Sequence, residues 1–234
     1  MIKTLGSIKN IDEARALSKL DFDIVDVKDV NDGALGYVGN NQIELIAKAI
    51  TNKDLSVTAG NYSHPNNIEV EKKLKFLCSI GIKYMKIGIF NMNFLDQHAI
   101  FLEKVSSYNI QTVGVIFANK DLQLNDILEV CKLDYDGLMI DTVTKSKMST
   151  LDILDRDFLM HFIQECRKKN KFCGISGSIN QDNIENAMQC KSDFIGFRGA
   201  LCLPTQRKYL DIKKCTDILN KVRDINLKMY QEAV

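Results

Sequence analysis

The sequence predicts a single-domain α/β protein with the (β/α)8 TIM-barrel fold over residues 1–234, and three observations support this fold class. Short apolar segments alternate with amphipathic segments about eight times along the chain. Continuous apolar strands of this kind are typical of a parallel sheet covered by helices. The connections are short and contain no linker, and the chain length suits one closed barrel. An open dinucleotide-binding sheet is disfavoured, because no G-x-G-x-x-G pattern opens the first crossover.

Four strand–helix units are expected in the first half of the chain. Asp23–Lys28 is the clearest strand, because β-branched residues dominate it and no strand breaker interrupts it. Asn10 is expected to cap the first helix, since its side chain can accept a hydrogen bond from a free backbone amide. The expected strands are Lys3–Ser7, Asp23–Lys28, Leu55–Gly60 and Tyr84–Ile89. Helices are expected after Asn10, over Asn41–Ile50 and Ile68–Ser79, and around Leu95–Val105.

The second half of the chain continues the same alternation. The expected strands are Gln111–Phe117, Leu138–Asp141, Phe172–Ser176 and Phe194–Arg198. The expected helices are Asn125–Cys131, Asp155–Lys169, Gln181–Gln189 and Asp211 to about Lys228. The basic run Lys168–Lys171 indicates a helix end, where cations complement the helix dipole.

The charge balance gives no sign of a polyanionic partner. The chain has 31 Lys and Arg against 30 Asp and Glu, a net charge of +1. A nucleic-acid or membrane-surface protein usually shows an obvious basic excess, so neither partner is expected. The N-terminal residues turn polar too soon for a secretory signal, and no apolar run reaches the length of a membrane span. A cytoplasmic location follows, while the sequence leaves open whether the chain forms a homo-oligomer.

Cysteine and histidine usage indicates no metal centre. The seven cysteines are odd in number, scattered and without a C-x-x-C pair, so neither a disulfide framework nor a zinc site is expected. His64, His98 and His161 are expected to have surface or packing roles.

Charged residues occur on the even-numbered apolar strands, near the ends where barrel enzymes carry their catalytic groups. Side chains alternate along a strand, so Asp26 and Lys28 point to the same face. Lys86 lies on the fourth expected strand, Asp141 ends the sixth and Arg198 ends the eighth. Alternate strands contribute to the same interior layer of a barrel, so these side chains are expected to converge at one mouth.

Each of these charged residues also has a structural interpretation. Asp26 and Lys28 could form an ion pair at a strand end, and Lys86 could neutralise Asp26 or Asp141. Asp141 could serve a turn, as aspartate often does. Lys145, expected in a loop over the same mouth, could simply be solvated. Arg198 requires an anionic partner, which could be a ligand or a buried carboxylate.

Two clustered lysines have a chemical use. An amine attacks a carbonyl only when it is neutral, and lysine is normally protonated near pH 7. Burial and a neighbouring cation both lower the pKa of a lysine, so Lys28 and Lys86 together could supply one nucleophile. The other lysine and a carboxylate could then move protons. The catalytic candidates are Lys28, Lys86, Asp141, Lys145 and Asp26.

The loops after the seventh and eighth strands indicate a phosphorylated small molecule as substrate. Gly177-Ser178 follows the seventh strand, and Arg198-Gly199-Ala200 follows the eighth. Glycines expose backbone amides, and these two loops often form the phosphate site of such barrels. The phosphate-binding candidates are therefore Gly177, Ser178, Arg198, Gly199 and Ala200.

Taken in order, five motifs resemble the (5-formylfuran-3-yl)methyl phosphate synthase family, the furan-forming enzymes of methanofuran biosynthesis. These motifs are D-I-V-D-V-K at 23–28 with G-A-L-G at 33–36, Y-M-K-I-G at 84–88, L-M-I-D-T at 138–142 with Lys145, G-S-I at 177–179 and G-F-R-G-A at 196–200. The resemblance implies a (β/α)8 lyase that condenses two glyceraldehyde 3-phosphates, with loss of phosphate and water. It also implies Lys28 as the Schiff-base lysine, Lys86 as the proton acceptor, Asp141 and Lys145 as further active-site positions, and no metal or organic cofactor.

The chain departs from the family pattern in loops over the expected mouth. The family usually has Pro where Val30 stands, a small residue at Tyr37, acidic residues at Asn61 and Asn119, and a glycine soon after the lysine matched by Lys145. Two alternatives therefore stay open. One is another Schiff-base aldolase or phosphosugar isomerase of the same barrel class, and the other is a catalytically inactive phosphosugar-binding barrel.

Overall fold

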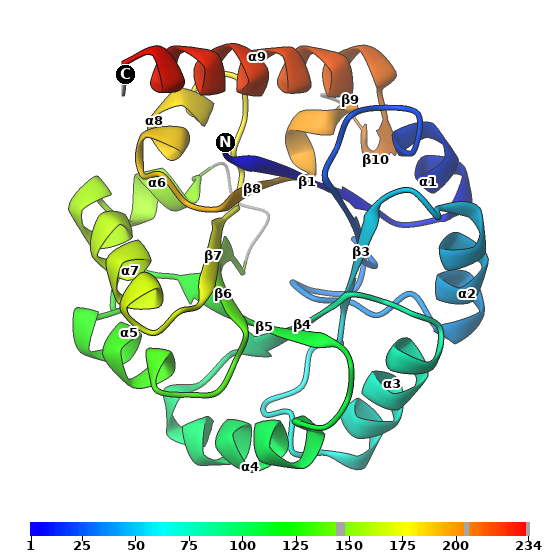
Figure 1. Ribbon diagram of the computed structural model, residues 1–234, viewed down its shortest axis with the longest axis vertical. Helices are drawn as coiled ribbons and strands as arrows, with labels where there is room; N and C mark the ends of the chain where they lie inside the picture. The colour runs from blue at the N-terminus through cyan, green and yellow to red at the C-terminus, as the bar shows by residue number, and fades with distance from the viewer. Residues whose placement is uncertain (144–147, 204–205, 233–234) are drawn as a thin grey trace.

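Eight parallel strands close into a barrel in the computed structural model, which describes residues 1–143, 148–203 and 206–232 (Figure 1). Each strand pairs with the next, and β1 pairs with β8 to close the sheet. The strands are β1 Lys3–Ile8, β2 Ile24–Val27, β3 Asp54–Thr58, β4 Tyr84–Ile89, β5 Gln111–Ala118, β6 Gly137–Thr142, β7 Phe172–Ile175 and β8 Phe194–Phe197. The predicted (β/α)8 fold class is confirmed.

Helices surround the barrel as an outer ring (Figure 1). They are α1 Ile11–Leu17, α2 Asn40–Ala49, α3 Ile68–Ser79, α4 Leu95–Val105, α5 Leu124–Cys131, α6 Thr150–Ile153, α7 Arg156–Lys168, α8 Ile184–Gln189 and α9 Ile212–Gln231. Asn10 caps α1 as predicted, because its side-chain oxygen accepts a hydrogen bond from the Glu13 amide at 3.0 Å. Among the described residues, no helix combines the length and apolar character that a bilayer crossing needs.

Five short elements were not predicted. They are the four-residue helix α6, the 3-10 turns η1 Met92–Phe94 and η2 Gly199–Leu201, and an antiparallel pair of β9 Cys202–Leu203 with β10 Gln206–Leu210. Segments this short carry no recognisable hydrophobic period, so periodicity could not indicate them.

The apolar core has two parts, one on each side of the strands. The larger part lies between the strands and the helices and includes fully buried Leu17, Ile43, Leu74 and Phe162. The smaller part fills the barrel interior; its buried members are Leu5, Ile24, Ala34, Leu35, Val113, Val115, Phe117, Met139 and Phe194. Charged groups on the interior face are therefore held in a largely apolar environment.

A side-chain contact ties the start of every even-numbered strand to the strand before it. The carboxylates of Asp23, Asp136 and Asp193, which directly precede β2, β6 and β8, accept hydrogen bonds from backbone amides of β1, β5 and β7. Each of these three bonds is 2.7 Å long. Before β4 the contact is an ion pair instead, because Lys83 Nζ lies 2.7 Å from an Asp54 oxygen at the start of β3. These four contacts fix the strand starts at the N-terminal end of the barrel.

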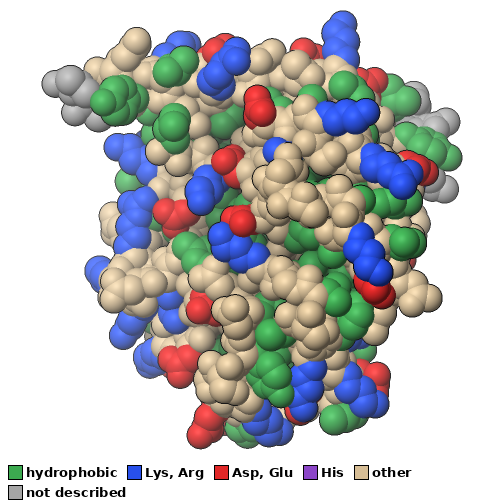
Figure 2. Space-filling view, turned by 45° about the vertical axis from the view of Figure 1, so that its right-hand side comes forward, with side chains coloured by type: hydrophobic (Ala, Val, Ile, Leu, Met, Phe, Trp, Pro, Cys, Tyr) green, Lys and Arg blue, Asp and Glu red, His purple; other side chains and the backbone are tan. Residues whose placement is uncertain are grey.

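The outer surface carries charges of both signs. On the face shown in Figure 2, Lys and Arg side chains are interspersed with Asp and Glu and with apolar groups. This mixture fits the net charge of +1.

Candidate active site

A cavity of about 640 Å³ opens at the C-terminal end of the barrel strands. We call it the mouth cavity. Lys28, Lys86, Asp141, Gly177, Ser178, Arg198 and Gly199, all predicted site residues, line it. The structure therefore brings side chains from β4 and β6 and from the loops after β2, β7 and β8 around one space. Asp26 and Ala200 lie outside this lining, and Lys145 lies outside the described residues.

Asp26 and Lys86 form a buried ion pair inside the barrel. Lys86 Nζ lies 2.6 Å from Asp26 Oδ2, and the two side chains are 3% and 0% exposed. The Ser7 hydroxyl donates to the same oxygen at 2.8 Å, and the Ser56 hydroxyl donates to the other at 2.9 Å. Strand register explains this arrangement, since Ser7, Asp26 and Ser56 are direct neighbours across β1, β2 and β3. Because a buried ion pair is tolerated only with good geometry and added hydrogen bonds, the serines stabilise it.

Lys28 lies directly beyond β2, and its backbone is fixed by a 2.9 Å hydrogen bond from its amide to the Ile8 carbonyl. Burial lowers the pKa of Lys28, because desolvation disfavours the ammonium form. The carboxylate of Asp141 opposes this shift, and the positive charge of Lys86 adds to it. The pKa of Lys28 is lowered overall, so a larger share of this amine is neutral than in a solvated lysine.

Asp141 is the second-last residue of β6 and stands half-buried at the mouth. One of its oxygens accepts a hydrogen bond from the Thr142 amide at 2.7 Å, which fixes the carboxylate against its own backbone. Asp141 thus makes the turn contact that the sequence left open, and its charge also acts on Lys28.

The turn after β7 has a backbone that requires glycine. Gly177 has a φ of +93°, and a Cβ built there would lie 2.3 Å from the Thr150 hydroxyl oxygen. Ser178 follows with a φ of +54°. Helix α6 docks on this turn, because the Thr150 amide donates to the Gly177 carbonyl at 3.1 Å and its hydroxyl donates to the Ser176 carbonyl. A signal for α6 existed in the sequence: Ser149 and Asp152 form the capping-box pattern.

Arg198 has the buried carboxylate partner that the sequence left open. Its two terminal nitrogens lie 2.6 and 3.1 Å from the oxygens of Glu13 on α1, and one also donates to the Ser7 carbonyl at 3.0 Å. Glu13 itself is only 7% exposed. Arg198 therefore ties α1 and β1 to the end of β8 while it lines the mouth cavity.

Two asparagines that depart from the family pattern hold loop backbone near the mouth. Asn61 uses both ends of its amide: its oxygen accepts from the Leu35 amide at 2.9 Å, and its nitrogen donates to the Asp32 carbonyl at 2.8 Å. A carboxylate could not donate the second bond. Asn119 makes the matching pair of local bonds with Phe117 and Asp121. Both substitutions thus have a structural explanation within their own loops.

Tyr209 of β10 also lines the mouth cavity and was not among the predicted residues. Its side chain is largely exposed, and Lys9 Nζ lies 4.9 Å from the centre of its ring. No sequence signal placed this aromatic ring at the mouth, because β10 was not expected as an element.

The fold and the site define a class: closed (β/α)8 barrels with a buried lysine–aspartate pair and a second, partly desolvated lysine at the mouth. The family model of 4-HFC-P synthase matches residues 4–218, and the chain belongs to this family. The family named from the sequence motifs is thereby confirmed.

Individual relatives agree with the family assignment. The chain is 30% identical over 227 residues to the (5-formylfuran-3-yl)methyl phosphate synthase of Methanococcus aeolicus, covering 90% of this chain and 94% of that protein. It is 27% identical over 217 residues to the protein of the same name from Methanocaldococcus jannaschii, covering 82% and 87%. Among solved structures, phosphoribosyl anthranilate isomerase from Thermus thermophilus superposes with a TM-score of 0.69 at 10% identity, covering 96% and 100%. That likeness shows the barrel fold alone.

Proposed function

We propose that this chain is a (5-formylfuran-3-yl)methyl phosphate synthase that uses Lys28 as a Schiff-base nucleophile on glyceraldehyde 3-phosphate. The observation that carries this proposal is the lowered pKa of Lys28 in a cavity shared with the fixed Lys86–Asp26 pair. A neutral amine is what imine formation requires. The names of the relatives supply the product class.

The carbon skeleton of the product dictates the bonds that form. One triose phosphate keeps its phosphate and becomes the phosphomethyl branch with two ring carbons. The other supplies the formyl group and two ring carbons and loses its phosphate. Two glyceraldehyde 3-phosphates therefore become one furan aldehyde phosphate, one inorganic phosphate and two waters, with no net oxidation or reduction.

The site residues can be assigned to these steps. Lys28 forms an imine with the aldehyde of the first triose, and loss of the C2 proton then expels phosphate from C3. After the second triose isomerises to its ketose form, C3 of the first bonds to its carbonyl carbon. Ring closure and loss of two waters give the furan, and hydrolysis of the imine frees Lys28. Lys86 is the proposed proton acceptor. It takes the C2 proton in the form in which its own proton has passed to Asp26 Oδ2, 2.6 Å away, and Asp141 and Lys145 assist proton transfer.

The phosphates are proposed to bind over the turns after β7 and β8. Gly177 and Ser178 offer backbone amides in a turn braced by α6, and Gly199 and Ala200 belong to the 3-10 turn η2. Arg198 contributes positive charge from beneath while it remains paired with Glu13.

Borohydride trapping tests the covalent step. The chain is incubated with glyceraldehyde 3-phosphate and reduced, and the adduct is located by peptide mass spectrometry; we expect it on Lys28. Lys28→Arg should give no adduct and no ultraviolet absorbance from furan. An adduct found only on Lys86 would show that Lys86 is the nucleophile and would contradict the role proposed for Lys28.

The same experiment separates the alternative functions. An adduct on Lys28 without furan absorbance would indicate another Schiff-base aldolase of the barrel class. Phosphosugar binding with neither adduct nor turnover would indicate an inactive binding barrel.

A further inference from the structure

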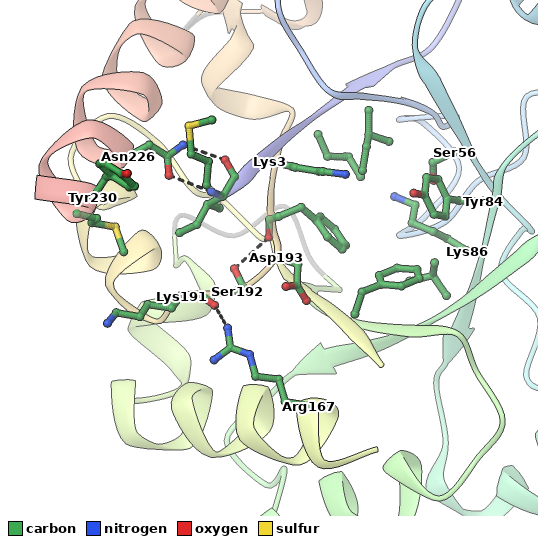
Figure 3. Close-up of a pocket in the computed structure, with 18 residues that line it drawn as sticks. Lys3, Ser56, Tyr84, Lys86, Arg167, Lys191, Ser192, Asp193, Asn226 and Tyr230 are labelled. Atoms are coloured by element: carbon green, nitrogen blue, oxygen red, sulfur yellow. Dashed lines mark hydrogen bonds between the residues drawn. The ribbon is translucent and has the colours of Figure 1, made fainter. Parts of the chain in front are cut away.

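A second cavity, again of about 640 Å³, opens at the opposite, N-terminal end of the barrel (Figure 3). We call it the lower cavity. Its lining includes the first residues of five barrel strands, namely Lys3, Ile24, Tyr84, Phe172 and Phe194. Leu5 and Lys86 are the two residues that line both cavities, so they form the partition between them. A volume of this size lies within the range of about 300–1,000 Å³ that is usual for small-molecule sites.

One wall of the lower cavity consists of three aromatic rings. The Tyr84 and Phe172 ring centres are 5.7 Å apart in an edge-on arrangement, and those of Phe172 and Phe194 are 6.3 Å apart. Two strand glycines leave room for the phenylalanine rings: a Cβ on Gly137 or Gly174 would lie 2.2 Å from Phe172 or Phe194, respectively. The rings are therefore fixed by packing, and the wall suits a flat apolar body.

The aliphatic side chains of Leu5, Ile24 and Val113 complete the apolar part of the lining. A planar ring system would contact hydrocarbon through them and aromatic faces or edges through Tyr84 and the phenylalanines. Such predominantly apolar walls with a few placed polar groups are typical of ligand sites.

The rim of the lower cavity carries more positive than negative charge. The positive side chains there are Lys3, Arg167 and Lys191, and the negative one is Asp193. The Asp193 carboxylate accepts a hydrogen bond from the Cys173 amide, and the Arg167 guanidinium donates one to the Lys191 carbonyl. Lys3 is exposed, and within the described part of the chain its ammonium has neither a hydrogen bond nor an ion pair. Figure 3 shows the Lys3 amine extended over the cavity. The Lys3 ammonium at the rim is thus available to pair with an anion bound in the apolar lower cavity.

We propose that the lower cavity is a second binding site, for a planar aromatic anion. The ring of the ligand lies against Tyr84, Phe172 and Phe194, and its sulfonate, carboxylate or phosphate pairs with Lys3. This site is separate from the mouth cavity and requires no group of the proposed reaction for binding.

The inner end of the lower cavity connects the site to the reaction. Ser56 and Lys86 line it, and both hold the buried carboxylate of Asp26. An occupant that contacts them changes the position of the ion pair which the proposed mechanism uses for proton transfer. This regulatory consequence rests on the proposed function, whereas the binding site does not.

Fluorescence titration with 8-anilinonaphthalene-1-sulfonate tests the binding site. The probe carries a flat naphthalene ring with a sulfonate, and its emission rises in apolar surroundings. We expect one equivalent to bind, Lys3→Glu to weaken binding at least fivefold, and Lys3→Arg to retain it. Lys3 is exposed, so neither change threatens the fold.

Val143→Glu provides the matched control at the other end of the barrel. Val143 is 48% exposed and lines the mouth cavity, so an added carboxylate there repels an anion from the mouth only. Binding that survives Val143→Glu and millimolar glyceraldehyde 3-phosphate but weakens in Lys3→Glu supports the lower cavity. Binding that is insensitive to Lys3→Glu, or is lost with Val143→Glu or with substrate, overturns the proposal.

Turnover measurements test the regulatory consequence. The probe should lower kcat for furan formation without raising KM, and Lys3→Glu should remove that inhibition. A purely competitive effect would contradict it. If the chain forms no furan, the proposed function fails while the titration still decides whether the second site exists.

Discussion

The pKa of Lys28 is subject to effects of opposite sign. Burial and the cation of Lys86 disfavour the ammonium form, while the carboxylates of Asp141 and Asp26 favour it. The pKa of Lys28 is lowered, so desolvation together with the cations of Lys86 and Arg198 outweighs the two carboxylates. The buried Lys86–Asp26 pair serves this balance, because Asp26 keeps a second cation fixed close to Lys28.

Asp141→Asn is expected to lower the pKa of Lys28 further, because it removes the largest charge effect that favours the ammonium. Reductive alkylation of Lys28, followed by peptide mass spectrometry over a pH series, reports the midpoint of amine deprotonation. The midpoint should move to lower pH in Asp141→Asn and stay in place in Asp157→Asn, which changes an exposed carboxylate on α7. A midpoint at higher pH would contradict the electrostatic account.

Ser56→Ala is expected to lower the free energy of unfolding by about 1–3 kcal/mol, since a buried carboxylate loses one of its donors. Ser56 is 1% exposed and donates to Asp26 at 2.9 Å. Urea unfolding measures the change. Ser79→Ala removes an exposed hydroxyl that donates to the Phe76 carbonyl, so its effect should stay within about 0.5 kcal/mol. Equal losses in the two variants would argue against a special role of the buried contact.

Strand alternation predicted that Asp26 and Lys28 share one face, because it depends only on local periodicity. The rule that alternate barrel strands contribute to one interior layer added Lys86. Local periodicity could not predict that Glu13 is the carboxylate partner of Arg198. Glu13 and Arg198 are 185 residues apart in sequence, and closure of β8 onto β1 brings them together. A sequence pattern can require an anion at such a position without identifying it.

Among the elements, the turn after β7 shows how a neighbouring helix fixes loop geometry. Thr150 of α6 bonds two successive carbonyls of this turn, those of Ser176 and Gly177. The turn was predicted from its glycine and its place after a strand. Helix α6 was not, because four residues cannot display helical periodicity and only the Ser149–Asp152 cap indicates it.

Gly177→Ala is expected to cost more stability than Gly39→Ala, although both glycines have positive φ values, +93° and +89°. A Cβ at Gly39 meets nothing within 4 Å, so only the backbone penalty of about 1–3 kcal/mol applies. At Gly177 the new Cβ also collides with Thr150 and Thr142. Thermal unfolding compares the two variants. Gly177→Ala alone should also raise KM for triose phosphate, and equal KM values would remove this turn from the proposed phosphate site.

For the whole molecule, the apolar strands predicted a parallel sheet covered on both faces, and eight such units in a chain of this length predicted that the sheet closes into a barrel. The sequence was less able to predict how individual residues pack. His98 is fully buried, and its Nδ1 lies 2.6 Å from the Tyr135 hydroxyl. Burial and, to a smaller extent, His64 lower the pKa of His98 to about 4. Of the surface or packing role expected for each histidine, His98 has the packing role.

Acidification should therefore destabilise the fold through His98. Its folded-state pKa of about 4 lies below the ordinary value of 6.5. Between these pH values the unfolded chain binds more protons than the folded chain, so stability falls as pH falls through 6.5. The full loss approaches about 3 kcal/mol near pH 4. Urea unfolding at pH 7 and pH 5 should show a smaller pH effect in His98→Asn than in the unaltered chain. An unchanged difference would assign the acid sensitivity to other groups.

The four contacts at the strand starts join the barrel strands in consecutive pairs. The pairs are β1–β2, β3–β4, β5–β6 and β7–β8. One carboxylate anchors each pair except β3–β4, which is held by the Lys83–Asp54 ion pair. The anchors all stand at the end remote from the mouth. Loops at the mouth can consequently be lengthened, shortened or exchanged while the parallel register within each pair is preserved. Lys53 and Lys171 add bonds between neighbouring pairs, because they donate to the Phe22 and Tyr135 carbonyls. The natural unit for recombination with a related barrel is therefore the whole set of strands with its anchored end, not the single strand–helix repeat.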